Sequence, residues 1–195
     1  MGAVSLQNLS SFTLLESPTK VKNLAENAKK KGYSALALTD INITYGLVNF
    51  YKAAKEVGIK PLLGMQLRIN GLIDEANKYD LIVIAKDDQG YKNILRLSSA
   101  VNLLTENGEK ENVLTLEELK KYLGHLVLIT PSNLHSELKM IQTNNPKMGA
   151  NIVRKLLDYL PTSSSLYLGV YAAQEQGEYI SYIRSLATQF NLSLT

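Results

Sequence analysis

Short apolar runs alternate with segments of helical periodicity along this 195-residue chain, and this alternation limits the folds that the chain can adopt. The run Ala35–Leu38 has the character of a buried strand and leads directly into Thr39 and Asp40, and Leu81–Ala85 is an uninterrupted apolar run of the same kind. Strands of this composition are usually covered on both faces, and strands that alternate with helices form βα units. The sequence therefore predicts an α/β domain built on a largely parallel sheet.

Turn and cap signals place the expected elements along the chain. Strands are expected at Val4–Leu9, Ala35–Leu38, Leu62–Ile69, Leu81–Ala85, Leu126–Thr130 and Leu166–Tyr171, with another beginning at Leu192. Helices are expected at 17–28, 47–54, 94–101, 115–123, 152–160 and 179–190, with a surface loop at 105–112. Ser17-Pro18 has the pattern of an N-cap and a first-turn proline, Gly58 that of a helix stop, and Thr115 to Glu118 that of a capping box. About seven strands separated by helices favour a barrel.

The chain is expected to be a single domain over residues 1–195, because no change in composition divides it. A hydrophobic content of 45% and a charged content of 20% are ordinary for a globular α/β core of this length. The sequence stops where a strand begins, at Leu192-Ser193-Leu194, without a polar tail. We therefore expect an N-terminal fragment of a longer protein, truncated at its last strand.

Composition excludes several functional classes. No apolar run reaches the roughly 18 residues of a membrane span, and no basic segment leads into a hydrophobic core of the secretory kind, so a cytoplasmic protein is expected. The absence of cysteine excludes disulfides and thiolate metal sites. A formal charge of +3 is too small to predict strong nucleic-acid binding. We assign the basic run Lys29–Lys31, which precedes Gly32, to a helix end where cations complement the dipole, in preference to a DNA contact.

The two histidines, His125 and His135, are the only imidazoles in the chain, and their spacing matches no metal-binding motif. His135 lies near Ser132, but no acid is placed to complete a catalytic triad. No phosphate-binding glycine loop and no His-Glu-x-x-His motif occur in the sequence. The sequence therefore predicts no catalytic residue and no cofactor-binding residue.

Five blocks of sequence, taken together and in order, carry a family resemblance. They are Phe12–Ser17, Ala35–Asp40, Tyr45–Ala54, Gly58–Gly64 and Leu81–Ile94. With these blocks the chain resembles the PHP (polymerase and histidinol phosphatase) domain of bacterial DNA polymerase III alpha subunits, clearly to about residue 100 and more weakly beyond it. The resemblance implies a distorted (β/α)7 barrel with mostly parallel strands alternating with helices.

The resemblance also assigns positions to the metal ligands of the family, and most of these positions have lost their ligand. The family positions fall on Gln7, Leu9, Glu16, Asp40, Ile41, Gln66 and Asp80. Leucine and isoleucine cannot bind a metal, and a neutral amide is a poor ligand for zinc or manganese. We therefore predict no metal site in this chain. One alternative is a single weakly held Mg²⁺ at Glu16 and Asp40, and the other is a structural hydrogen-bonding role for Asp40.

By this resemblance, the chain is a degenerate, metal-poor scaffold for a polymerase core. The intact protein would extend DNA from deoxynucleoside triphosphates (dNTPs) with Mg²⁺, using residues outside this sequence. The expected partners are the remainder of the polymerase chain and other replisome subunits, with DNA and dNTPs contacted only through the intact protein and no membrane. Two alternatives remain. One is a residual metal-dependent phosphoesterase or 3′-5′ exonuclease using Glu16 and Asp40, and the other is a docking module for an exonuclease or replisome partner, which predicts an exposed apolar patch.

Overall fold

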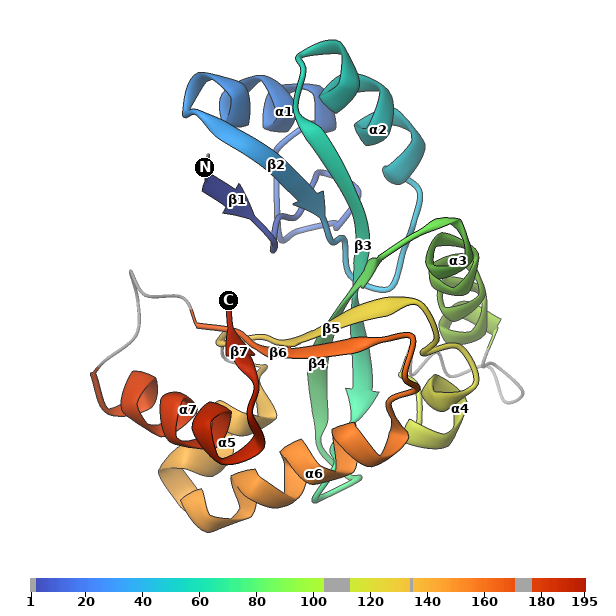
Figure 1. Cartoon of the computed structure of the whole chain (residues 1–195). Coiled ribbons are helices and arrows are strands. Elements are labelled where there is room, and N and C mark those ends of the chain that lie inside the picture. The colour runs from blue at the N-terminus through green and yellow to red at the C-terminus, as the bar shows by residue number, and fades with distance from the viewer. Residues whose placement is uncertain (1–2, 104–112, 134, 171–176) are drawn as a thin grey trace.

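The computed structural model describes residues 3–103, 113–133, 135–170 and 177–195 (Figure 1). The strands of the described residues are β1 (Ala3–Ser5), β2 (Tyr33–Leu38), β3 (Lys60–Asn70), β4 (Lys78–Ala85), β5 (Leu126–Thr130), β6 (Ser165–Leu168) and β7 (Ser193–Leu194). The helices are α1 (Val21–Lys30), α2 (Leu47–Glu56), α3 (Asp88–Leu103), α4 (Leu116–Lys120), α5 (Glu137–Asn144), α6 (Gly149–Tyr159) and α7 (Gly177–Phe190), with a 3₁₀ turn, η1, at Pro146–Met148. No helix in these ranges is both long enough and apolar enough to cross a bilayer.

The strands form one sheet in the order β1 to β7, which curves into a half-barrel with helices on its outer side (Figure 1). The pairs β1–β2, β2–β3, β5–β6 and β6–β7 are parallel. The pairs β3–β4 and β4–β5 are antiparallel. The predicted α/β distorted barrel with mostly parallel strands is therefore confirmed. The expected alternation fails at one place, because a turn and not a helix joins β3 to β4.

Strand β3 changes partners part of the way along its length, and this change produces the bend of the sheet. Its first residues, Lys60–Leu63, pair in parallel with β2, and residues from Gly64 onward pair antiparallel with β4. At Gly64 a Cβ atom would lie 2.7 Å from the carbonyl oxygen of Val83, so only glycine fits this close approach of two backbones. Figure 1 shows β3 as the long strand that links the β1–β2 part of the sheet to the β4–β7 part.

Alternate residues of β3 and β4 serve two different hydrophobic clusters, as the two-residue period of a strand requires. The larger cluster packs under the helices and includes Met65, Leu67, Leu81 and Val83. The smaller cluster lies on the concave face of the sheet and consists of Ala37, Ile82, Ile84 and Ile129. The prediction that Leu81–Ala85 is covered on both faces is confirmed, because residues 81–84 are all buried.

Most local signals read from the sequence are confirmed. Thr115 and Glu118 form the predicted capping box at the start of α4. Gly32 and Gly58 follow α1 and α2 with φ of 80° and 72°, and Lys29 and Lys30 lie in the last turn of α1. The predicted loop at 105–112 and the end of the predicted strand at residue 171 lie outside the described residues.

Two boundaries near the N-terminus were predicted wrongly. Strand β1 ends at Ser5 and not at residue 9, because the backbone and side chain of Asn8 bond to Thr39 and Ala37 in place of a regular ladder. Helix α1 begins at Val21 after Lys20, so Ser17 is not its N-cap. The Ser17 hydroxyl instead donates to the carbonyl oxygen of Leu9 at 3.0 Å, which places it in the loop before the helix.

Helix α3 packs so closely on the start of β5 that a larger residue at Gly90 should destabilise the fold. A Cβ atom at Gly90 would overlap the backbone carbonyl oxygen of His125, which cannot move without shifting β5. We expect Gly90→Ala to cost about 1–3 kcal/mol of unfolding free energy, measured by urea denaturation. Gly177→Ala at the start of α7 is the matched control, because no atom of the described residues lies within 4 Å of its Cβ position. Equal midpoints for the two variants would contradict this packing.

Candidate functional site

Asp40 follows the carboxyl end of β2, where α/β proteins commonly place functional residues, and it is 1% exposed. Its Oδ1 accepts hydrogen bonds from the Ser10 backbone N–H at 2.6 Å and from the Thr13 hydroxyl at 2.8 Å. Its Oδ2 accepts from the Ser10 hydroxyl at 2.7 Å. We call Asp40, Ser10 and Thr13 the Asp40 cluster. It fastens the loop before α1 to the end of β2.

A second set of polar side chains lies on the concave face of the sheet. Gln7 Nε2 donates to Gln66 Oε1 at 2.9 Å, and Gln66 Nε2 donates to Asp80 Oδ2 at 2.8 Å. The other carboxylate oxygen, Asp80 Oδ1, lies 3.1 Å from Arg68 Nε. We call Gln7, Gln66, Asp80 and Arg68 the polar chain. The β3–β4 register produces it, because Gln66 pairs with Ile82 and Arg68 with Asp80, so all these side chains fall on one face.

The polar chain satisfies its own hydrogen bonds. Gln66 is 2% exposed and the Asp80 side chain is fully buried. Because Asp80 can only accept when ionised, the Gln66 amide must turn its NH₂ group toward it and its oxygen toward Gln7. The guanidinium of Arg68 then compensates the buried negative charge.

The three remaining family positions, Leu9, Glu16 and Ile41, add no side-chain hydrogen bond to the polar chain within the described residues. Glu16 is exposed in the loop before α1, and no hydrogen bond or ion pair joins it to Asp40 within the described ranges. Ile41 forms an isolated parallel bridge with Gln66, and its N–H donates to the Thr13 hydroxyl at 3.2 Å. Leu9 is half-buried. The structure thus brings Gln7, Gln66 and Asp80 into one chain of contacts and leaves Glu16 outside it.

The residues at these positions do not fit a metal ion. Asp40 is enclosed by neutral donors of the protein, and Asp80 is paired with a guanidinium that would repel a cation. Across the part of the chain that the structure describes, no three His, Cys, Asp or Glu side chains gather as a ligand set. The chemistry available at this face is hydrogen bonding between protein groups.

The two histidines contribute to separate structural contacts. His125, in a left-handed turn with φ of 61°, places Nδ1 2.7 Å from Asp87 Oδ2. The hydrogen bond from the Gly90 N–H, followed by that from His125, lowers the pKa of the exposed Asp87 carboxyl. The backbone carbonyl of the exposed His135 accepts from the Asp80 N–H at 2.9 Å. Both arrangements support elements of the fold.

Sequence reasoning missed two charged residues, Arg68 and Glu137. Arg68 neutralises Asp80. The sequence feature that could have revealed this role is a charged residue within an otherwise apolar strand. Glu137, 6% exposed at the start of α5, accepts from the backbone N–H groups of Leu72 at 2.9 Å and Ile73 at 2.8 Å. Burial, above all, raises the pKa of Glu137. It clamps the turn between β3 and β4 to α5.

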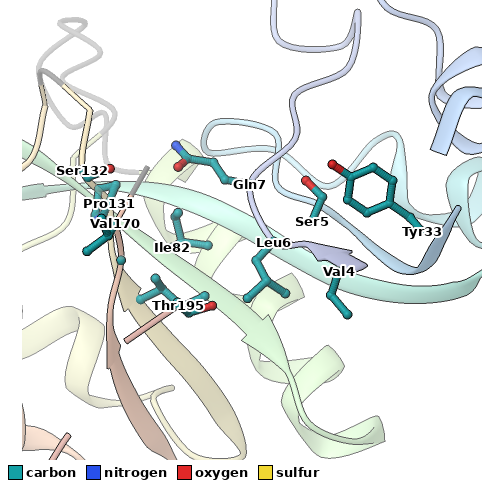
Figure 2. A pocket seen from close by; sticks show the side chains of 12 residues that line it. Val4, Ser5, Leu6, Gln7, Tyr33, Ile82, Pro131, Ser132, Val170 and Thr195 are labelled. Carbon is teal, nitrogen blue, oxygen red and sulfur yellow. The ribbon is translucent and has the colours of Figure 1, made fainter. Parts of the chain in front are cut away.

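One hollow beside these residues is lined without charged side chains. A cleft of about 270 Å³ lies between the β1 edge and the ends of β6 and β7 (Figure 2). Figure 2 shows Leu6 and Gln7 on one side and Pro131 and Val170 on the other, with Ile82 between them. None of its twelve lining residues is an Asp, Glu, Lys, Arg or His. The cleft therefore offers no side-chain cation for a phosphate group.

Comparisons with known proteins agree with this architecture. A family model described as the PHP domain matches residues 5–170. The chain is 34% identical over 170 residues to DNA polymerase III subunit alpha of Halalkalibacterium halodurans, an alignment that covers 87% of this chain and 15% of the relative. It is 30% identical over 175 residues to the same subunit of Aquifex aeolicus, covering 83% and 15%. The chain thus spans about 15% of the length of these relatives.

Solved structures share the fold at low sequence identity. A candidate metal-dependent phosphoesterase from Bifidobacterium adolescentis superposes with a TM-score of 0.67 at 13% identity, covering 98% of this chain and 85% of that one. An amidohydrolase from Chromobacterium violaceum gives a TM-score of 0.65 at 12% identity, covering 98% and 84%. At such identities the likeness concerns the fold alone. The family match and the relatives confirm the resemblance read from the sequence, and the chain belongs to the PHP domain family.

Proposed function

We propose that this chain is a degenerate, metal-poor PHP domain that acts as a structural scaffold for a polymerase of the DNA polymerase III alpha type. The polar chain is the observation that carries this proposal. Family ligand positions are occupied by Gln7, Gln66 and Asp80, which bond to one another and to Arg68. A face built in this way is stable without an ion, as a scaffold requires.

Binding a divalent cation at this face would have a high cost. The ion would have to displace Arg68 from Asp80, and breaking a buried ion pair typically costs about 3–5 kcal/mol, less here because Arg68 is partly exposed. Binding of the ion to the amide oxygens of Gln7 and Gln66 would compensate only weakly for the lost ion-pair energy. The same argument speaks against the alternative of a residual phosphoesterase or exonuclease, whose proposed ligands Glu16 and Asp40 are not brought together.

An exposed apolar patch supports the proposal that another part of a polymerase packs against this domain. We group as this patch the exposed side chains of Phe12, Leu14 and Leu15 in the loop before α1, together with those of Tyr45, Val48, Leu95 and Leu103. Phe12 lies against Gly46, next to Tyr45, and Tyr45, Leu95 and Leu103 line one hollow. Exposed apolar side chains that lie together often mark a protein–protein interface, and burying each leucine on a partner would contribute about 1.5–3 kcal/mol.

Leu15 is the most unusual member of the patch. It is fully exposed and has a left-handed backbone with φ of 66°, a conformation that costs a non-glycine residue roughly 1 kcal/mol. The neighbouring Asp40 cluster holds this loop in place. We infer that the remainder of an alpha-subunit chain covers the patch, with DNA, dNTPs, Mg²⁺ and other replisome subunits engaged only through that larger protein. The patch equally suits a docking module for an exonuclease or replisome partner, which is the second candidate function.

Metal content is the first test of the proposal. After dialysis against Zn²⁺, Mn²⁺ and Mg²⁺, the purified chain should hold less than about a tenth of an equivalent of metal and should hydrolyse neither a phosphate monoester nor a DNA 3′ end. Mass spectrometry of the metals and the two assays would be run on the same sample. Near-stoichiometric metal that is lost in Asp40→Asn or Asp80→Asn would contradict the proposal.

The scaffold role can be tested in a chimera in which this chain replaces the aligned residues of the Halalkalibacterium halodurans alpha subunit. We expect the double variant Leu14→Asp and Leu15→Asp to lower the thermal midpoint of the chimera by several degrees while leaving that of the isolated chain unchanged. Met140→Asp, at an exposed position on α5, is the matched control. An unchanged chimera would refute the patch as the contact surface. A chimera with normal stability but weakened binding of a replisome subunit would favour the docking module.

A further inference from the structure

A small cavity lies beneath the polar chain, between the ends of β4 and β5 and helices α5 and α6. Its volume is about 20 Å³. Apolar side chains such as Leu81, Leu138 and Ile152 form most of its wall. Beside the half-buried Tyr79, the polar residues of the wall are Asp80, Thr130, Ser136 and Glu137. Each of these four is buried.

The hydroxyl of Thr130 is the feature that calls for an explanation. Within the described part of the chain, its Oγ1 is buried and has no hydrogen-bond partner. Thr130 ends β5, and its backbone carbonyl is already used by the Gly169 N–H at 2.9 Å. A buried hydroxyl without a partner is strongly disfavoured, so native proteins rarely leave one. Either another group bonds to this hydroxyl, or its burial without a partner lowers the stability of the fold.

Other polar residues of the cavity can form hydrogen bonds beyond those they already make. The two carboxylate oxygens of Glu137 accept one backbone N–H each, from Leu72 and Ile73, and each oxygen has a second lone pair. The Ser136 hydroxyl accepts from the Lys139 N–H at 3.4 Å and still has its own proton to donate. Acceptors and donors therefore surround the same small space.

We propose that this cavity binds one ordered water molecule that bonds to the Thr130 hydroxyl and bridges it to the buried carboxylate of Glu137. A cavity needs about 10–15 Å³ of space and two to four polar partners to hold a water, and this cavity meets both conditions for a single molecule. The water connects the end of β5 to the residue that clamps the β3–β4 turn. It also supplies a hydrogen-bond partner to a hydroxyl that no group of the described residues reaches.

A monovalent cation is the other small species that two nearby carboxylates could attract. The mostly apolar wall favours water, because a bare ion needs several oxygen ligands. The two occupants differ in contact distances and in salt dependence. A crystal structure and an exchange of salt therefore distinguish water from a cation.

The test compares the wild-type chain with Thr130→Val, which has nearly the same shape and lacks the hydroxyl. With a bridging water, Thr130→Val removes one partner of that water, and we expect the unfolding equilibrium constant to rise about fivefold. If the cavity is dry, the same change removes an unsatisfied hydroxyl, and the variant should be more stable than the wild type. The sign of the change therefore decides the question, and the valine side chain is small enough for both proteins to fold.

A crystal structure of the wild-type chain at high resolution provides the second readout. The proposal requires a density peak within about 2.7–3.2 Å of Thr130 Oγ1 and of a Glu137 carboxylate oxygen. An empty cavity would overturn it. The proposal would also be overturned if the thermal midpoint rises when choline chloride is replaced by sodium chloride at equal concentration. That result would identify an ion and not a water.

Discussion

Replacing Asp40 with alanine should lower the free energy of unfolding by about 3–5 kcal/mol. The change removes a buried carboxylate that accepts from the Ser10 N–H, the Ser10 hydroxyl and the Thr13 hydroxyl. All three donors are buried at this point and would be left without their acceptor. Because these contacts join the loop before α1 to the end of β2, the loss should appear as a large shift of the urea midpoint.

Two further variants make the Asp40 result specific. Asp40→Asn keeps an oxygen that can replace Oδ1 for two of the donors and an NH₂ group that the Ser10 hydroxyl can accept, so its cost should be nearer 1 kcal/mol. Asp158→Ala, at an exposed position on α6, should change stability by less than about 0.5 kcal/mol. If Asp40→Ala were no worse than Asp158→Ala, the structural role of Asp40 would be wrong.

Replacing Glu137 with alanine should be the second large loss, about 2–4 kcal/mol. The backbone N–H groups of Leu72 and Ile73 would lose their acceptor where the β3–β4 turn meets α5. Lys155, whose Nζ donates to the Leu72 carbonyl at 2.7 Å, would then hold the turn alone. Glu56→Ala on α2 is the control, because that glutamate is exposed. Hydrogen exchange at Leu72 and Ile73 should accelerate in Glu137→Ala and stay unchanged in the control.

Glu137 also predicts a dependence of stability on pH, and its sign follows from the raised pKa. Burial raises the pKa of Glu137 in the folded chain above its unfolded value of about 4.3. Its stabilising contribution is therefore fully present below pH 4.3 and is lost as the pH rises through the folded pKa. Relative to Glu137→Gln, the wild type should be more stable near pH 4 than near pH 7. A difference in urea midpoints that stays constant over this range would contradict the burial of a titrating carboxyl.

Local signals explain why much of the fold could be predicted. The capping box at Thr115 and Glu118 and the helix stops at Gly32 and Gly58 depend on neighbours within four residues, so their meaning does not change with the rest of the fold. The direction of a buried strand has no such signal. An apolar run such as Leu81–Ala85 is compatible with either orientation, which is why the antiparallel β3–β4 pair was not foreseen.

The candidate site could likewise be predicted only in part. The residue types at Gln7, Leu9 and Ile41 were enough to predict a metal-poor face, because chemistry alone makes them poor ligands. Their partners could not be predicted. Gln7 and Gln66 lie 59 residues apart, and Ser10 and Asp40 lie 30 apart.

The sequence by itself determined the α/β class, the family, most helix ends and the residue types at the family ligand positions, because these depend on composition and on contacts between near neighbours. Only the tertiary structure decided that Asp80 meets Arg68, that Asp40 meets Ser10 and Thr13, and that Glu137 is buried. Those contacts depend on strand register and on the partner change at Gly64, which are set by packing across the whole sheet. A shift of one residue in the β3–β4 register would place Arg68 and Asp80 on opposite faces of the sheet.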